Sequence, residues 1–171
     1  DNVSIRKTVS SDKINWVSSE SYVTVEPGAT FYYRVTVTNN SESAITNLVI
    51  ADDIPRLDDG RGTRWAPTLV SGSVTATGKI DLYYSANGQD AGITVAGVLA
   101  SGAVTIPEGY GDNAAGAQSI LAVIDTVPVG ESVQLEFTCT APRADDATTQ
   151  NAYYQMGYND AWCTFTEAYG V

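Results

Sequence analysis

The sequence predicts an all-β protein, an antiparallel β-sandwich, and three observations lead to that prediction. Short runs rich in Val, Thr, Tyr and Ile alternate apolar and polar residues. Gly, Pro, Asn and Ser separate these runs at short intervals. No segment shows a sustained helical period with capping residues, so we expect any helix to be one or two turns long. Because alternation places every second side chain on one face of a strand, regular short strands between turns are typical of a sandwich with a buried interior.

The first half of the chain predicts three strands. Residues 3–9 form the first, with odd-numbered residues facing inward. Residues 31–38 alternate most cleanly and place four apolar side chains in the interior, namely Phe31, Tyr33, Val35 and Val37. Residues 45–52 form the third strand. It ends before Pro55, because proline has no N–H to give to a strand ladder.

The second half predicts four more strands and the middle an elaboration. The four strands are expected over residues 118–127, 131–140, 150–158 and 162–168. Residues 56–117 are polar or rich in Gly and Ala, with one or two strands over 73–85 and long loops with one or two strands over 91–118. We interpret 56–117 as an insert between the two halves of one sandwich, so that residues 1–171 form a single domain.

Composition excludes several classes of function. The 171 residues include 20 acidic and 9 basic ones, giving a net charge of -11, which argues against nucleic acid or an anionic membrane as partner. Histidine is absent, which excludes His-based triads and His-ligated zinc. No apolar run is long enough to insert into a membrane. The chain begins inside a strand pattern without a signal peptide, so we expect it to be a mature or excised part of a longer protein.

Two charged residues fall on strand faces that the alternation assigns to the interior. Lys7 has the parity of Val3, Ile5 and Val9, and Asp52 has the parity of Leu48 and Ile50. Buried charges are costly unless they pair or react, so we predict that Lys7 and Asp52 meet inside the sandwich. The alternatives are a Lys7 that extends to water from an edge strand, an Asp52 that caps a turn, and an unreacted buried salt bridge.

Three segments, taken in order, carry a resemblance to known proteins. They are the lysine-bearing strand 5–9 (IRKTV), residues 25–39 (VEPGATFYYRVTVTN) with 49–55 (VIADDIP), and residues 127–135 (VPVGESVQL) with QNA at 150–152. Together they resemble the Ig-like domains of Gram-positive surface proteins and pilus subunits that form internal isopeptide bonds, including the DUF11-like repeats. The resemblance covers both ends of the chain and hardly touches residues 56–117. It implies an Ig-like form of the predicted sandwich.

The resemblance also implies roles for three residues. Lys7 is the nucleophile, Asn151 the acyl partner and Asp52 the catalytic acid; Asn159 is the alternative partner, because Asn151 has the parity of Tyr153 and not of the core face. Burial favours a neutral amine and a protonated carboxyl group, so the amine attacks the carboxamide carbon and ammonia leaves. The reaction needs no cofactor and occurs once per molecule, so we do not expect an enzyme.

These inferences give two functional hypotheses. The leading one is a structural stalk or adhesin domain of a bacterial surface protein or pilus. It would be extracellular, anchored to the cell wall through a segment outside this sequence, and in contact with neighbouring domains of the same protein or with a host protein or glycan. The alternative is a ligand- or carbohydrate-binding module that uses the loops of residues 56–117, because loops on a rigid scaffold often carry binding.

Smaller features leave further alternatives open. Cys139 and Cys163 both have inward parity and form either one disulfide or two buried thiols. Asp53, Asp58 and Asp59 are a weak calcium candidate, but their spacing does not match an EF-hand loop, so a solvated acidic loop is the more ordinary interpretation. Several aromatic residues could line a binding site or simply pack against the core, namely Trp65, Tyr83, Tyr84, Tyr110, Tyr153 and Tyr158.

Overall fold

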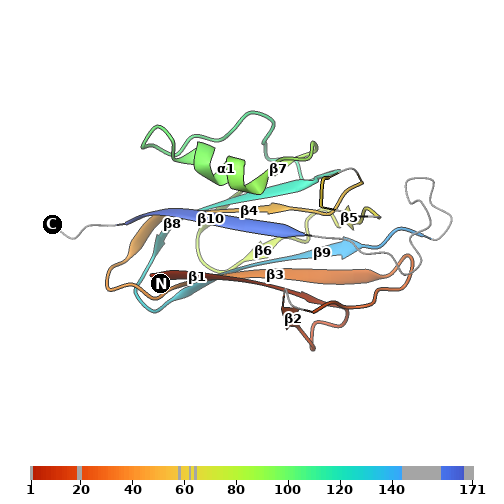
Figure 1. Cartoon of the computed structure of the whole chain (residues 1–171). Coiled ribbons are helices and arrows are strands. Elements are labelled where there is room, and N and C mark those ends of the chain that lie inside the picture. The colour runs from red at the N-terminus through yellow and green to blue at the C-terminus, as the bar shows by residue number, and fades with distance from the viewer. Residues whose placement is uncertain are drawn as a thin grey trace.

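The computed structural model is an antiparallel β-sandwich of two stacked sheets, which confirms the predicted fold class (Figure 1). It describes residues 2–18, 21–57, 59–61, 63, 65–143 and 159–167. The predicted strand at 150–158 lies outside the described residues, and so do Asn151, Tyr153, Tyr158 and Asp58.

Sheet A is the lower layer in Figure 1. It contains β1 (Val3–Ser10), β2 (Val17–Ser18), β3 (Thr30–Asn39), β5 (Thr68–Leu69), β6 (Thr75–Ala76) and β9 (Ser132–Thr140). The strand order is β2-β1-β3-β9-β5, and β6 also pairs with β9. Sheet B contains β4 (Ile45–Asp53), β7 (Ile80–Ser85), β8 (Ser119–Val127) and β10 (Asp160–Glu167), in the order β10-β4-β8-β7.

The main core lies between the two sheets and follows the predicted alternation. The inward residues of β3 are buried as expected, namely Phe31, Tyr33, Val35 and Val37. Their partners on β9 alternate in the same phase, so that Val35 pairs with Leu135 and both are fully buried. β1 follows the pattern less closely: Ile5, predicted to face inward, is 40% exposed, whereas Thr8 and Ser10, of the outward phase, are buried.

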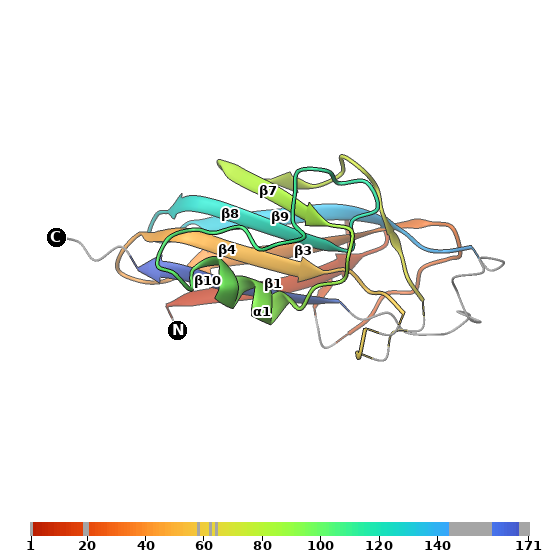
Figure 2. The ribbon, with the colours of Figure 1, turned by 90° about the horizontal axis from the view of Figure 1, so that it is seen from above.

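Sheet B has a second core on its outer face. A helix, α1 (Ala91–Val98), covers this face, as Figure 2 shows from above. Val49, Ala51 and Leu121 of the sheet pack there against Val95 and Val98 of the helix. Because both faces of β4 and β8 are buried, these strands have long apolar runs without strict alternation.

The middle of the chain is more regular than predicted. Residues 56–117 add β5 and β6 to sheet A and β7 to sheet B, and they form α1 where we expected a loop or strand. Asp90 caps the helix by accepting a hydrogen bond from the Ile93 amide at 3.0 Å. Sequence pattern missed the helix because its β-branched residues favour strands and because exposed Ile93 breaks a one-sided apolar stripe.

Candidate functional site

Lys7 and Asp52 meet in the interior, as the strand parities predicted. Lys7 extends from β1 in sheet A and Asp52 from β4 in sheet B, and the Lys7 Nζ contacts Asp52 Oδ2 as an ion pair. The lysine side chain is 15% exposed and the aspartate side chain is 0% exposed. The structure therefore excludes a Lys7 that extends fully into water and an Asp52 that caps a surface turn.

Aromatic rings surround the amino group of this pair. The Lys7 Nζ lies 4.8 Å from the centroid of the Tyr33 ring and 5.7 Å from that of Phe137. The negative faces of such rings attract a cation and replace part of its lost hydration. The rings also keep water away, so the amine and the carboxyl group interact in a medium of low polarity.

Asn159 completes this interior cluster. It directly precedes β10, in which Ala161 pairs with Asp52, so Asn159 has the inward parity of Ala161. Its side-chain nitrogen and oxygen are buried and, like Asp52 Oδ1, make no hydrogen bond of ordinary geometry with any described residue. Its carboxamide is nevertheless close enough to Asp52 to lower the pKa of that carboxyl group. β1 and β10 also touch each other, although they belong to different sheets.

The pKa of Asp52 lies above its usual range. Burial is the main cause and raises the pKa, while Lys7 and Asn159 oppose the shift by favouring the charged form. The interior cluster, which we define as Lys7, Asp52 and Asn159, thus combines an amine, an acid with a raised pKa and a buried carboxamide. From the sequence, Asn159 was the alternative partner, and Asn151 lies outside the described residues.

The outer face of sheet A is a second candidate site. Four rows of polar side chains cross β1, β3 and β9, and we call them the polar grid. The rows are Ser4 with Thr38 and Ser132, Arg6 with Thr36 and Gln134, Thr8 with Arg34 and Glu136, and Ser10 with Tyr32 and Thr138. Sequence reasoning missed this site, because alternation marks such positions only as solvent-facing.

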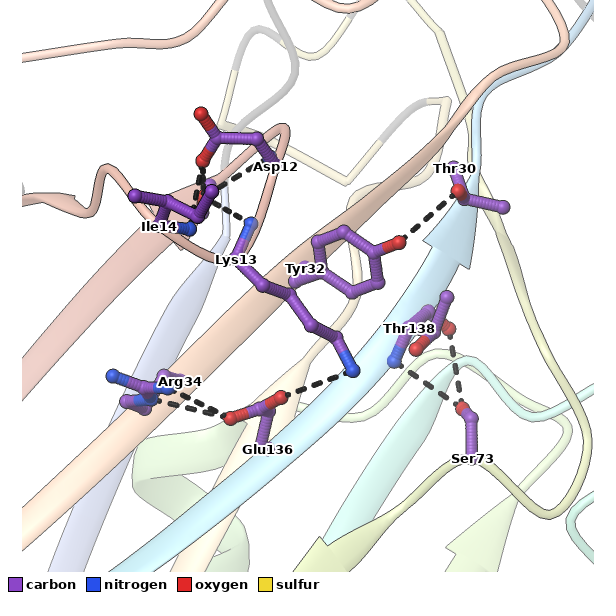
Figure 3. A network of polar contacts seen from close by, with 10 residues as sticks. Asp12, Lys13, Ile14, Thr30, Tyr32, Arg34, Ser73, Glu136 and Thr138 are labelled. Atoms are coloured by element: carbon purple, nitrogen blue, oxygen red, sulfur yellow. Dashed lines mark hydrogen bonds and ion pairs between the residues drawn. The ribbon is translucent and has the colours of Figure 1, made fainter.

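An array of aromatic and charged side chains lies on the polar grid, and Figure 3 shows four of its members, namely Lys13, Tyr32, Arg34 and Glu136. Arg34 donates from Nε and Nη2 to Glu136 Oε2 at 3.2 and 3.0 Å, and Lys13 Nζ lies 3.5 Å from Glu136 Oε1. The Arg34 guanidinium lies 3.8 Å from the centroid of the Trp16 ring. The Lys13 Nζ lies 4.7 Å from the centroid of the Tyr32 ring. We call Trp16, Arg34, Glu136, Lys13 and Tyr32 the surface array.

The loop between β1 and β2 holds two members of the surface array in place. Asp12 Oδ1 accepts hydrogen bonds from the amides of Ile14 and Asn15, both at 2.8 Å, and Asp12 Oδ2 accepts one from Asn15 Nδ2 at 2.9 Å. These hydrogen bonds hold the pKa of Asp12 well below its usual range. The loop that carries Lys13 and Trp16 is therefore built before any ligand arrives.

Of the three calcium-candidate residues, Asp53 and Asp59 are described, and both accept hydrogen bonds from protein donors. Asp59 accepts hydrogen bonds from Arg61, from Thr63 and from the Arg56 amide. Asp53 accepts one from Ser119 Oγ at 2.7 Å and one from the Ala91 amide at 2.8 Å. Protein donors thus occupy these carboxylates, and no group of three or more acidic or cysteine side chains that could hold a metal occurs among the described residues.

The cysteines and the middle aromatics have packing roles. Cys139 and Cys163 are both free thiols, on strands of opposite sheets, so the disulfide alternative is not formed. Trp65 packs edge-on against Phe31 with ring centroids 5.7 Å apart, and Tyr84 packs against the main core. Tyr83 and Tyr110 pack against the second core beside α1.

Comparisons with known proteins return solved structures only. No protein-family model matches the chain, and no curated protein matches its sequence. A family IIIA CBD from Clostridium cellulolyticum matches with 17% identity and a TM-score of 0.37, covering 99% of this chain and 96% of the other. A family 3a carbohydrate binding module from a scaffolding of Clostridium thermocellum matches with 13% identity and a TM-score of 0.34, covering 99% and 100%.

A third match is to biomass-sensing modules of Clostridium thermocellum that resemble a family 3 carbohydrate-binding module of the cellulosome. The identity is 14% and the TM-score 0.32, covering 98% of this chain and 97% of the other. The chain is similar to each of these three proteins, with TM-scores below 0.5. Among the described residues, no helix is long and apolar enough to cross a membrane.

The comparisons correct the family resemblance drawn from the sequence. The structural neighbours are family 3 carbohydrate-binding modules, and no model of a pilin or DUF11-like repeat family matches. The identification as a Gram-positive pilin or adhesin domain of the isopeptide-forming type was therefore wrong, and it gives no support to an isopeptide bond here. The error has a physical cause: the motifs that carried it, an alternating strand after a Pro-Gly turn and a second Pro-x-Gly turn, report strand-and-turn geometry common to many sandwiches.

Proposed function

We propose that this chain is a non-catalytic, extracellular carbohydrate-binding module whose glycan lies on the outer face of sheet A. The observation that carries the proposal is the surface array, in which two aromatic rings and three charged groups are held together on an otherwise hydroxyl-rich sheet. The partner is a glycan, and the site is a preformed surface that performs no reaction.

The chemistry of the surface array suits a sugar. A pyranose ring presents C–H groups, which pack on aromatic rings, and hydroxyl groups, which need both donors and acceptors. Trp16 and Tyr32 supply the rings. Arg34 and Lys13 donate hydrogen bonds, Glu136 accepts them, and the Ser and Thr hydroxyls of the polar grid other than the buried Thr8 and Ser10 do both. Because the ion pairs fix these side chains in advance, binding costs little side-chain entropy.

The loops of residues 56–117 are the less favoured location for this site. Their aromatic residues Trp65, Tyr83, Tyr84 and Tyr110 pack against the two cores and leave little ring surface for a ligand. The binding hypothesis therefore stays, but its site moves from the loops to sheet A.

Glycan binding tests the proposal directly. We would measure binding of the whole chain to a panel of polysaccharides by affinity electrophoresis and calorimetry. Tyr32→Ala and Trp16→Ala are each expected to weaken binding about tenfold, because truncating a central interface aromatic costs more than about 1 kcal/mol. Trp162→Ala is the matched control, since Trp162 is 55% exposed on β10 of the other sheet. Equal losses in all three variants, or no bound glycan, would contradict the proposal.

The interior cluster favours a second role, an internal covalent cross-link. We propose that Lys7 Nζ attacks Cγ of Asn159, forming an amide bond, while the Cγ–Nδ2 bond breaks. Nδ2 leaves as ammonia after receiving the proton that the amine gives up through the Asp52 carboxyl group. The neutral form of Asp52, favoured by its raised pKa, donates to the carboxamide oxygen and stabilises the charge that develops there.

Such an amide would join the two sheets near both ends of the described chain. The cross-link would close a loop of about 150 residues, for which the chain-entropy model for disulfides gives a stabilisation of roughly 5 kcal/mol. Unlike a disulfide, it resists reduction. A cross-linked sandwich is compatible with glycan binding, because the interior cluster and the surface array lie on opposite faces of sheet A.

Intact-mass measurement tests the cross-link. The chain is expected to weigh less than its sequence by one ammonia, and Lys7→Ala, Asp52→Ala and Asn159→Ala are each expected to abolish the deficit. Asn151→Ala is the matched control and is expected to keep it. A full sequence mass in the parent chain would refute the cross-link, and loss of the deficit in Asn151→Ala alone would move the acyl partner back to Asn151.

A further inference from the structure

The outer face of sheet A differs in charge from the rest of the molecule. The chain has 20 acidic and 9 basic residues, yet three of the basic ones lie on or over the polar grid, namely Arg6, Lys13 and Arg34. Among the described residues, the acidic ones on this face are Glu136 and Asp12. This face is therefore a local exception on a strongly acidic protein.

Both acidic groups on this face are already occupied. Glu136 pairs with Arg34 and Lys13 at the same time. Asp12 accepts its hydrogen bonds from its own loop and from Ser10. Neither carboxylate needs a cation from a ligand. Because two carboxylates face three basic side chains, the negative charge only partly offsets the positive charge on this face.

The basic groups, in contrast, have donors to spare. Arg6 is exposed and makes no ion pair or hydrogen bond with any described residue. Arg34 uses Nε and Nη2 for Glu136, and its Nη1 donates to no described residue. The Lys13 side chain is 52% exposed. Unused donors on charged groups make strong hydrogen bonds to anionic oxygens.

The strand register places these donors in adjacent rows. Arg6 pairs with Thr36, and Arg34 pairs with Thr8 in the next row, so Arg6 and Arg34 are diagonal neighbours on adjacent strands. The backbones of such diagonal neighbours lie about 7–8 Å apart, so their long side chains can reach the same ligand. An extended polymer with regularly spaced negative charges can therefore contact both arginines at once.

The outer face of sheet B has the opposite character. Asp81 on β7 and Asp125 on β8 are exposed and share the parity of the residues that pack under α1. An anionic polymer would be repelled from this side and steered toward sheet A. The difference in charge between the two faces thus favours approach of such a polymer to the outer face of sheet A.

We infer that the glycan bound on sheet A is an acidic polysaccharide that bears carboxylates, of the uronate type, with Arg6, Arg34 and Lys13 as the groups that select it. This inference rests on the proposed function and names its ligand class. Hydroxyls of the same polymer pair with the Ser and Thr side chains of the polar grid, and its ring faces pack on the aromatic residues of the surface array.

A matched pair of polymers tests the inference. Binding of the whole chain to polygalacturonate would be compared with binding to the same polymer after its carboxyl groups are reduced to alcohols, and with binding to cellulose. We expect polygalacturonate to bind most tightly. Its affinity should fall about tenfold or more between low salt and about 0.5 M salt, because screening weakens exposed charge contacts. Arg6→Gln should weaken the binding severalfold, whereas Lys79→Gln, which removes an exposed charge elsewhere, should not.

Three outcomes would overturn the inference in distinguishable ways. Equal binding of the reduced polymer or cellulose, with no salt dependence, would refute the acidic ligand and leave the carbohydrate-binding proposal standing. Equal losses in Arg6→Gln and Lys79→Gln would show a non-specific charge effect and refute the selecting role of this face. Failure to bind any of the three polymers, or any glycan of the wider panel, would refute the proposed function itself.

Discussion

The interior cluster and the surface array contain similar groups in opposite surroundings. Each places a lysine against a carboxylate and beside a tyrosine ring: Lys7 with Asp52 and Tyr33, and Lys13 with Glu136 and Tyr32. The Lys7 and Asp52 side chains are 15% and 0% exposed, whereas the Lys13 and Glu136 side chains are 52% and 17% exposed. The difference teaches that burial decides the role of such a pair. Away from water it becomes a reactive or structural centre, and in contact with water it remains available to a ligand.

The largest expected difference between the two regions is in stability. Lys7→Ala leaves Asp52 without its cationic partner in the core and is expected to lower the free energy of unfolding by about 3–5 kcal/mol. It would also remove any cross-link through Lys7. Chemical denaturation of the purified variant, next to the parent chain, measures this loss.

A double variant sharpens that prediction. Lys7→Met combined with Asp52→Leu removes both charges and fills the space with apolar atoms, so it should recover much of the loss from Lys7→Ala. If the single variant unfolds like the parent chain, the pair is not energetically coupled and the comparison of the two regions fails.

An intermediate effect is expected from pH. Because the folded-state pKa of Asp52 is raised above its unfolded value of about 3.8, the folded chain holds this proton more tightly. The stability gained in this way is present below the unfolded pKa and is lost as pH rises through the folded pKa. Asp52→Asn cannot titrate, so the difference in unfolding free energy between parent and variant should change across this window.

Unfolding curves of both chains over a pH series test the point. Parallel pH profiles would mean that Asp52 titrates normally in the folded chain. Glu136→Gln is a suitable control, because it removes a carboxylate that pairs on the outer face of sheet A, away from the interior cluster.

The smallest expected effect is that of the surface array on stability. Glu136→Gln is expected to lower the free energy of unfolding by about 1 kcal/mol or less, and added salt should reduce the difference further. The same substitution should alter glycan binding, because it releases Arg34 and Lys13 from their shared partner. Thermal unfolding at two salt concentrations measures the first effect. A loss as large as that of Lys7→Ala would show that the array serves the fold and not a ligand.

The fold could be predicted from the sequence where the signal, the alternation of apolar and polar residues, was local. Alternation alone identified the inward faces of β3 and β9 and placed Lys7 and Asp52 in the interior. It failed at α1, where β-branched residues form a helix because the outer face of sheet B offers a surface to bury Val95 and Val98. It also failed at Ile5, which has inward parity on β1 and yet is 40% exposed.

For the candidate sites too, the sequence predicted what depends on local spacing and missed what depends on tertiary contacts. The sequence pointed to Lys7 and Asp52, because a charge on an apolar face is visible from spacing alone. The family resemblance ranked Asn151 above Asn159, although strand parity argued against Asn151, and Asn151 lies outside the described residues. Nothing in the sequence indicated that Trp16 would lie over Arg34, because those residues meet only after the loop between β1 and β2 folds back over sheet A.

The amino-acid sequence by itself determined that this protein is a sandwich, which side chains each strand turns inward, and that an amine and a carboxyl group share its interior. Period-two alternation is a property of neighbouring residues, so it needs no knowledge of the partner strands. Only the tertiary structure decided that Asn159 joins the interior pair, that α1 covers sheet B, and that five side chains assemble on sheet A. Those contacts join residues far apart in the chain, and their geometry exists only once strand register and sheet packing are set.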